Sequence, residues 1–470
     1  MATNVAATSY PIRSVGDSIW YTLKQTSTVP TNLNYRFEVL VYNKGTVATI
    51  PQSPSSNAIG LIDLSTLLNS YLSYDFQPTI TYSYTRPNSS INYRLKWTSY
   101  TGSTALEYEN TSSSTLYFTR SLAFNGSKRI ADNWSYQDYL LNANTKKPMS
   151  EFTSQKMLTT DWGTLTTFNG QIGQDTSSLY TSYPAYMILD VTYSGTGFDY
   201  PTRKVYSLTN RYPGSLFTTD NVVLQDSQRI EIEWPMGPAN ILANTGISTN
   251  PVYSFRKCYQ SGIGETMTPA TIYPSATYDS GTTILTNAIS YQIYWVSALP
   301  SFTTSAATFL VNLEANRVST KYTITLESEC KYTPVQLSWL NEMGAFEYFT
   351  FRKANSKNVI MNRKVYDKYP YTVNSTTGVV SKETYKYGRT AFDTTISTSH
   401  VINTDWITDT ESLALETLWS SAQVFAYIDS TWKPIILDVS DMTIQRKPEV
   451  KMCQYSINFV SSDDKKTISQ

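Results

Sequence analysis

The feature that most constrains this chain is a two-residue alternation of apolar and polar side chains. Between residues 33 and 42 the side chains Tyr35, Phe37, Val39 and Val41 fall on one side of an extended backbone. The same alternation recurs at residues 18–24, 186–193, 229–234, 289–296 and 424–428. Tyr contributes 37 residues, and Tyr, Thr, Val and Ile suit half-buried pleated surfaces. The pattern predicts a mainly β chain of several antiparallel β-sandwich-like domains with a few short helices.

Length and the spacing of the predicted strands suggest a division into domains. A chain of 470 residues is long enough for two to four domains. We expect an N-terminal β-sandwich over residues 1–125, a central β region of one or two domains over 126–330, and a C-terminal β domain over 331–470.

Two segments depart from alternation and predict short helices. Residues 61–72 place apolar side chains at helical spacing, with Asp63 as a natural N-cap. In the C-terminal domain a helix is expected near 408–420. There Thr408 and Glu411 have the spacing of a capping box, and Leu413, Leu415, Leu418 and Trp419 follow as the expected apolar side.

Charge and cysteine content narrow the class of protein. The 37 basic and 37 acidic residues give a formal net charge of zero without a long basic run, so nucleic acid is not expected as a partner. The first 17 residues do not have the pattern of a signal peptide, and no apolar run predicts membrane insertion. Cys258, Cys330 and Cys453 are odd in number and far apart, which favours free thiols. Synthesis in a cytoplasm is therefore expected.

The sequence offers little that resembles catalytic chemistry. His400 is the single histidine, which excludes multi-histidine metal motifs, and it lies in an alternating strand pattern. Phosphate-binding glycine loops are missing as well. Glu231 and Glu233 lie two apart on one predicted strand and could in principle form a carboxylate pair, but we interpret them as solvent-facing. The chain is expected to be neither an enzyme nor a protein with a cofactor, a catalytic residue or a metal site.

Clusters of aromatic residues are the remaining candidates for function. They could be strand faces and cores of a Tyr-rich β protein, subunit contacts, or platforms on which sugars stack. Tyr366, Tyr369 and Tyr371 form one such cluster. The candidate interface residues are Tyr82, Tyr84, Tyr291, Tyr294, Trp295, Phe346, Phe349 and Phe351.

Several segments resemble tail-associated virion proteins of tailed bacteriophages, especially those that infect Bacteroidetes. Near the N-terminus these are the strand at 33–42, a Lys-Gly turn and the segment 60–68. Residues 234–240 (WPMGPAN) resemble a Pro-x-Gly-Pro-x-Asn element. Residues 337–351 (LSWLNEMGAFEYFTF) resemble a Leu-Asn-x-x-Gly-Gly-Phe-Asp-x-Phe-x-Phe hairpin, from which Ala345 and Glu347 depart. The segment 413–421 and the strands after it resemble the closing unit of that group.

The resemblance implies a structural virion protein of the tail, baseplate or tail tip. Its implied partners are other copies of itself, in a ring, and neighbouring tail proteins; its implied location is the virion. A near-zero net charge suits dense self-assembly. A receptor-binding module for host surface glycans is the main alternative, and a polysaccharide-degrading enzyme and a secreted adhesin are lesser ones.

Overall fold

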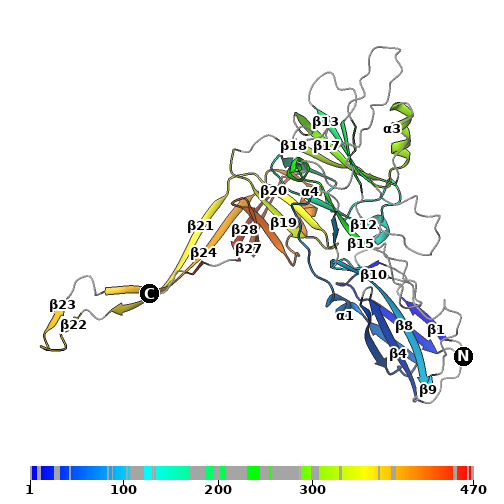
Figure 1. The fold of residues 1–470 in the computed structure, drawn as a ribbon, viewed down its shortest axis with the longest axis horizontal. Helices are drawn as coiled ribbons and strands as arrows, with labels where there is room; N and C mark the ends of the chain where they lie inside the picture. Colours follow the sequence, from blue (N-terminus) through cyan, green and yellow to red (C-terminus); the bar gives the residue numbers. More distant parts are fainter. Residues whose placement is uncertain are drawn as a thin grey trace, which may run out of the picture. The chain divides into compact units, whose positions relative to one another are not determined.

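The computed structural model confirms that the chain is mainly β, with several antiparallel sheets (Figure 1). The residues it describes are 3–7, 12–25, 32–41, 44–81, 84–86, 88–101, 104–105, 121–129, 131, 134–169, 186–193, 202–207, 230–243, 253–255, 285, 287–297, 306–327, 331–368, 371–382, 388–447, 452–462 and 465–466. The chain divides into two compact units. Unit 1 holds residues 1–328 and 340–348, and unit 2 holds residues 329–339 and 349–470.

The N-terminal part of unit 1 contains two sheets. One has the order β1 (Thr3–Ala7), β3 (Trp20–Gln25), β6 (Ile59–Asp63). The other has the order β2 (Ile12–Ser14), β10 (Ser121–Phe124), β8 (Ser90–Thr101), β4 (Leu33–Val41), β5 (Gly45–Gln52), with β9 (Thr104–Ala105) beside β8.

A common core joins these two sheets into a sandwich. Along β4 buried and less buried residues alternate, as the sequence predicts. Phe37 from β4 and Leu95 from β8 share one cluster with Leu23 from β3 and Ile62 from β6. Each sheet therefore buries one face against the other, as in other β-sandwiches.

The first helix is shorter than expected. α1 covers only Ser65–Asn69. The N-cap position is Leu64 rather than the predicted Asp63. The Oδ1 atom of Asp63 accepts the Ser65 amide at 2.9 Å and the Ile19 amide at 2.9 Å, so this carboxylate links the start of the helix to the sandwich.

The remainder of unit 1 contains two more sheets and short helices. One sheet has the order β11 (Ser154–Leu158), β18 (Tyr322–Glu327), β17 (Ala288–Val296), β13 (Tyr186–Tyr193), β14 (Thr202–Ser207), β16 (Tyr253–Phe255). The other has the order β12 (Thr164–Asn169), β15 (Ile230–Pro235), β7 (Tyr84–Arg86). The helices are η2 (Tyr136–Asp138), α2 (Pro238–Ala243) and α3 (Ala306–Ala315).

The described strands of unit 2 belong mainly to one sheet. Its order is β20 (Phe346–Phe351), β19 (Val335–Leu340), β26 (Val424–Ile428), β27 (Thr431–Lys447), β28 (Met452–Ser461), β24 (Gly388–Asn403), β21 (Ser356–Lys368). β25 (Ile407–Thr408) pairs with β28, β29 (Lys465–Lys466) pairs with β24, and β22 (Tyr371–Val373) pairs with β23 (Val380–Lys382). The tip of the β19–β20 hairpin, residues 340–348, is assigned to unit 1.

The predicted capping box is confirmed at helix α4 (Asp409–Glu416). The Thr408 hydroxyl accepts the Glu411 amide, and the Glu411 side chain accepts the Thr408 amide at 2.9 Å. The helix buries Leu415, and Leu418 after it, whereas Leu413 is 65% exposed, so the expected apolar side is wrong at that one position.

One of the two predicted domain boundaries lies close to the division between the units. The expected start of the C-terminal domain, at 331, lies two residues from the start of unit 2 at Glu329. The predicted ranges 1–125 and 126–330 both fall essentially within unit 1. Their separation stays a prediction.

Candidate interaction surface

A long two-stranded ribbon in unit 2 is the most distinctive surface of the described residues. β21 and β24 pair antiparallel from Ser356 with Val401 to Lys368 with Gly388, and they run side by side in Figure 1. We call residues 356–403 the arm. The small β22–β23 hairpin lies within this segment of the chain.

Local turn chemistry explains why the chain reverses within the arm. In the turn between β22 and β23 the Oδ1 atom of Asn374 accepts the amides of Thr376 at 2.9 Å and Thr377 at 3.2 Å. Gly378 follows with a φ of 66°, a left-handed conformation that glycine adopts without strain. Asn and Gly here favour the hairpin without help from a hydrophobic core.

Most of the arm lacks cover from the rest of the described chain. β24 pairs with β28 through residues 399–403 and with β29 through residues 395–396. Within the described residues its outer part, 388–394, pairs with β21 alone. Among the described strands β21 is the last in the sheet order, so no described strand pairs with its other edge. An open edge strand is a template for pairing with another chain.

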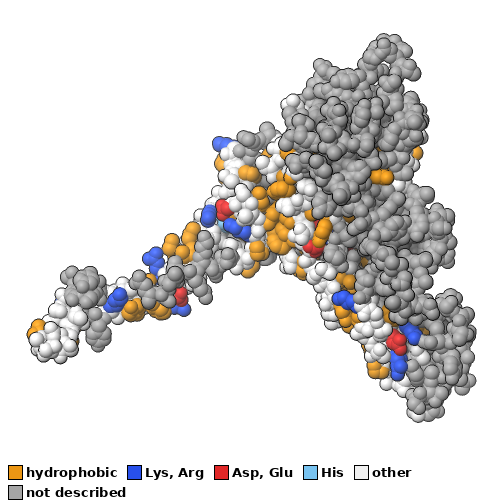
Figure 2. All heavy atoms as spheres, in the orientation of Figure 1, with side chains coloured by type: hydrophobic (Ala, Val, Ile, Leu, Met, Phe, Trp, Pro, Cys, Tyr) orange, Lys and Arg blue, Asp and Glu red, His pale blue; other side chains and the backbone are white. Residues whose placement is uncertain are grey.

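Apolar side chains are exposed on both faces of the ribbon. Successive side chains along a strand point to opposite faces. Val359, Met361 and Val365 therefore share one face of β21 and are 49%, 55% and 49% exposed. Ile360 and Tyr366 share the other face and are 57% and 43% exposed. Figure 2 shows hydrophobic side chains in patches along the ribbon.

A two-stranded ribbon with exposed apolar side chains on both faces gains little stability from its own chain. A two-stranded ribbon without a packed face is only marginally stable in water. Contiguous exposed apolar surface on a folded protein usually marks a site of interaction. The arm therefore has the properties of a segment that is buried against another protein.

The arm also carries positive charge. Its described carboxylates are both paired, Asp393 with Lys364 at 3.2 Å and Asp367 with Arg389 at 3.4 Å. Exposed pairs of this kind contribute little stability. Within the described part of the chain Lys368 forms no ion pair, so the outer part of the ribbon keeps an excess of basic side chains.

Most of the aromatic residues that were predicted to form an interface lie in the core. Tyr291, Tyr294, Trp295, Phe346 and Phe351 are each at most 2% exposed within this one chain. The prediction that they form a contact surface is therefore wrong for the folded subunit. The reason is that the two faces of their strands are both covered.

Hydrogen bonds account for the buried tyrosines among them. The Tyr291 hydroxyl donates to the Met236 carbonyl at 2.7 Å, and the Tyr294 hydroxyl donates to Asp190 at 3.2 Å. With its hydroxyl satisfied, a tyrosine acts as a large core residue.

The other aromatic candidates have mixed positions. Phe349 is half-buried and lies edge-on to Phe351, with ring centroids 5.2 Å apart. Tyr84 is half-buried and donates to Asp75 at 2.9 Å. Tyr82 lies outside the described residues. The cluster that does reach solvent is on the arm: Tyr366 is 43% and Tyr371 55% exposed, and Tyr369 lies outside the described residues.

The carboxylates of β15 are also placed differently from the prediction. Glu231 and Glu233 are fully buried rather than solvent-facing. Glu231 pairs with the buried Arg86 of β7 at 3.0 Å, and Glu233 accepts the Thr164 hydroxyl at 3.1 Å. Burial raises the pKa of Glu233 to about 7, against the opposing effect of Arg86. Side chains sealed in this way fix the interior of unit 1 and offer no surface to a substrate.

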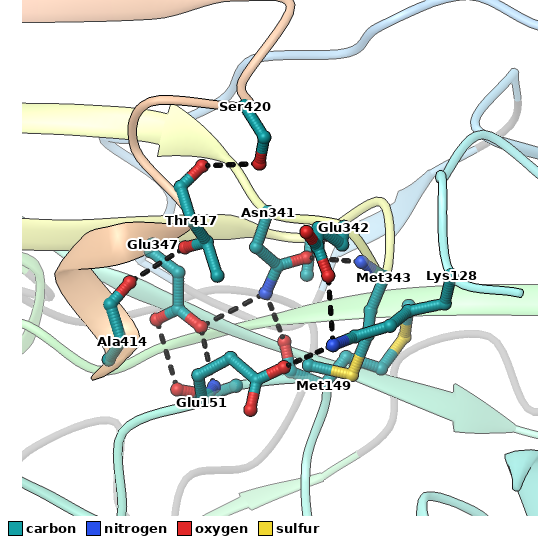
Figure 3. Close-up of polar contacts among 12 residues, drawn as sticks. Lys128, Met149, Glu151, Asn341, Glu342, Met343, Glu347, Ala414, Thr417 and Ser420 are labelled. Atoms are coloured by element: carbon teal, nitrogen blue, oxygen red, sulfur yellow. Dashed lines mark hydrogen bonds and ion pairs between the residues drawn. The ribbon is translucent and has the colours of Figure 1, made fainter. Parts of the chain in front are cut away.

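A second buried polar network holds the hairpin tip at residues 340–348 (Figure 3). Arg86 donates to the Gly344 carbonyl at 2.7 Å. Glu347 accepts the Glu151 amide at 2.7 Å and the Ser150 hydroxyl at 3.0 Å. Burial raises the pKa of Glu347 to about 7, although these hydrogen bonds lower it. Glu347 departs from the aspartate of the resembling motif and reaches both partners.

Asparagines organise two of the segments that carry the resemblance, 337–351 and 234–240. Asn341 accepts the amides of Met343 and Ala345 and donates to the Met149 carbonyl and to Glu347, all at 3.0 Å. Asn240, in the segment 234–240, accepts the Gly163 amide at 2.8 Å and donates to two backbone carbonyls. Both side chains are buried, so these motifs are structural.

The remaining candidates for chemistry have structural surroundings. His400 stacks on Phe459, with ring centroids 5.0 Å apart, and burial together with nearby Lys357 lowers its pKa. Cys453 is a buried free thiol, while Cys258 and Cys330 lie outside the described residues. Among the described residues no cluster of His, Cys, Asp and Glu is arranged to hold a metal, and no helix has the length and apolarity to cross a membrane.

Comparison with known proteins gives no relative. Neither a scan against models of protein families nor a search of curated proteins found a match for this chain.

Proposed function

We propose that this chain is a non-enzymatic structural protein that assembles through its arm, and that it acts in the tail, baseplate or tail tip of a bacteriophage virion. The observation that carries the assembly role is the arm itself. Within the part of the chain that the structure describes, it combines an open edge strand, a ribbon whose outer part is uncovered and apolar side chains exposed on both faces. The proposed location in the tail rests on the resemblance of short sequence motifs to tail-associated virion proteins of bacteriophages.

The interior of the chain supports a structural role. Three of its buried ionisable groups, Arg86, Glu231 and Glu347, bond to one another, to backbone or to neighbouring side chains, which fixes loops in place. A subunit of a large assembly needs rigid cores and one accessible contact element. Strand addition along an edge gives affinity through backbone hydrogen bonds, while side chains beside it give specificity.

The test is incorporation into particles. In the armless variant, residues 363–394 are replaced by Asn-Gly, a two-residue turn that joins the paired positions Asn362 and Thr395. We expect mass spectrometry of purified virions to find the wild-type chain at a small symmetric copy number and to find the armless chain strongly depleted. Val311→Ser changes an exposed apolar residue outside the arm and is expected to leave incorporation normal.

Two results would overturn the proposal. If the wild-type chain is missing from purified particles, the structural role in the virion is rejected. If the armless chain is incorporated at the wild-type copy number, the virion role survives but the arm is not the assembly element.

A glycan-binding role is the second candidate, and the exposed aromatic side chains of the arm favour it. Tyr366 lies edge-on to Phe392, with ring centroids 6.0 Å apart, and both side chains are more than 40% exposed. Exposed aromatic faces can stack on sugar rings. A glycan array with the wild-type chain and with Tyr366→Ala tests this role. Specific binding by the wild-type chain that the variant loses supports glycan binding, and no binding by the multivalent wild-type chain rejects it.

A further inference from the structure

Charge is distributed unevenly between the arm and the rest of the sequence. The whole chain is neutral, yet the arm holds seven basic residues and only three acidic ones. The basic residues are Lys357, Arg363, Lys364, Lys368, Lys382, Lys386 and Arg389, and the acidic ones are Asp367, Glu383 and Asp393. The remaining residues, 1–355 and 404–470, which we call the body, therefore carry a net charge of −4 that balances the arm's +4.

The arm's positive charge is accessible to a partner. Lys357, Arg363 and Lys368 are exposed along β21, the strand with the open edge. Their neighbours on the same strand are exposed apolar side chains. A partner surface that fits this strand must therefore supply carboxylates together with apolar area.

From this distribution we propose that the arm of one copy binds the acidic body of a second copy, head to tail. The inference rests on the proposed assembly function and names the partner. Arm-to-body contact brings opposite net charges together, and complementary potentials both speed and orient association. Burial of the apolar side chains of β21 in the same contact removes them from water.

The charge distribution argues against a symmetric arm-to-arm contact. Two paired arms would bring together two segments that each carry a net charge of +4. A head-to-tail contact has no such repulsion. Because a head-to-tail contact uses different surfaces on the two copies, it closes into a ring when the rotation allows and otherwise continues as a filament.

The armless variant allows a direct test of whether the arm of one copy contacts the body of another. It lacks the outer arm, residues 363–394, but keeps the body that should accept an arm. We would mix unlabelled full-length chain with ¹⁵N-labelled armless chain and treat the mixture with a carbodiimide, which joins lysine amines directly to carboxylates. We expect crosslinked peptide pairs made of an unlabelled arm lysine and a labelled body carboxylate. Crosslinks between arms only, or no crosslinks between copies, would overturn the inference.

A charge-reversal variant repeats the test on a full-length chain. Lys357→Glu, Arg363→Glu and Lys368→Glu together are expected to abolish the oligomers that the unsubstituted chain forms in light scattering. The matched control, Lys357→Arg, Arg363→Lys and Lys368→Arg, keeps every charge and is expected to retain oligomers in light scattering. Equal oligomerisation of the reversed and control variants would contradict the role of charge.

The outcomes separate this inference from the function on which it rests. If the armless chain is excluded from virions but arm-to-body crosslinks are missing, the arm binds a different tail protein and only the inference fails. If such crosslinks form but the chain is absent from virions, self-association stands and the virion role fails.

Discussion

The buried asparagine of the hairpin tip gives the sharpest prediction for stability. Asn341 forms four side-chain hydrogen bonds, two as acceptor and two as donor, all at 3.0 Å. Asn341→Ala removes all of them and leaves two amides, one carbonyl and one carboxylate oxygen without this partner. At roughly 1 kcal/mol for each net hydrogen bond, we expect unit 1 to lose about 4 kcal/mol of unfolding free energy.

An exposed asparagine with similar chemistry provides the control. Asn374 also accepts two amides of its own turn, but it lies in solvent in the arm. Water replaces the lost bonds after Asn374→Ala, so the expected cost is below about 1 kcal/mol. Urea unfolding followed by tryptophan fluorescence measures both variants, and hydrogen exchange of the peptide over residues 340–348 localises the effect. Equal costs for the two variants would refute the argument that burial sets the magnitude.

Three further predictions test the tip and the capping box. Gly344→Ala is expected to lower the free energy of unfolding by about 3 kcal/mol, because φ is 83° and a Cβ would lie 2.3 Å from a backbone oxygen. Gly378→Ala, with a φ of 66° and open space around the Cβ, should lower it by only about 1 kcal/mol. Equal shifts of the melting temperature for the two variants would contradict this. Burial raises the pKa of Glu347 from 4.5 to about 7, so the folded chain holds this proton more tightly and stability falls as pH rises through that window. In urea unfolding, the free energy of unfolding of the wild-type chain should fall by on the order of 3 kcal/mol at most between pH 4.5 and 7, and Glu347→Gln should abolish this fall. An unchanged pH dependence in the variant would count against the role of Glu347. Thr408→Ala should lower the stability of unit 2 by about 1 kcal/mol in the same unfolding assay, and no loss would mean that the Glu411 contact alone caps the helix.

Local sequence patterns were sufficient to predict strands and core residues where each strand buries one face. Phe37 and Val39 in β4 alternate with polar residues, and the sandwich core contains them as expected. The capping box at Thr408 and Glu411 depends on residues three apart, so sequence alone predicts it. Period and spacing are local properties, and local properties can be worked out without knowing the fold.

Partners distant in sequence could not be predicted in this way. Glu231 alternates with Ile232 as an outward-facing residue would, but β7 brings Arg86 against it from 145 positions earlier in the chain. The same limit applies to the aromatic candidates. Alternation at Tyr291 indicates that one face is covered, without indicating whether the cover comes from the same chain. Among the aromatic-cluster residues that the structure describes, only Tyr366 and Tyr371 lie on the arm, and both are exposed.

The assignment of residues 340–348 to unit 1 has a consequence for synthesis on the ribosome. Domains commonly fold from the N-terminus onward as the chain emerges. When a nascent chain has emerged as far as Ser328, Arg86 still lacks the Gly344 carbonyl and Gln155 still lacks the Tyr348 carbonyl to which it donates at 2.9 Å. Unit 1 therefore completes its interior only after translation has passed beyond β19, most of which belongs to unit 2, so the folding of the two units is coupled in time.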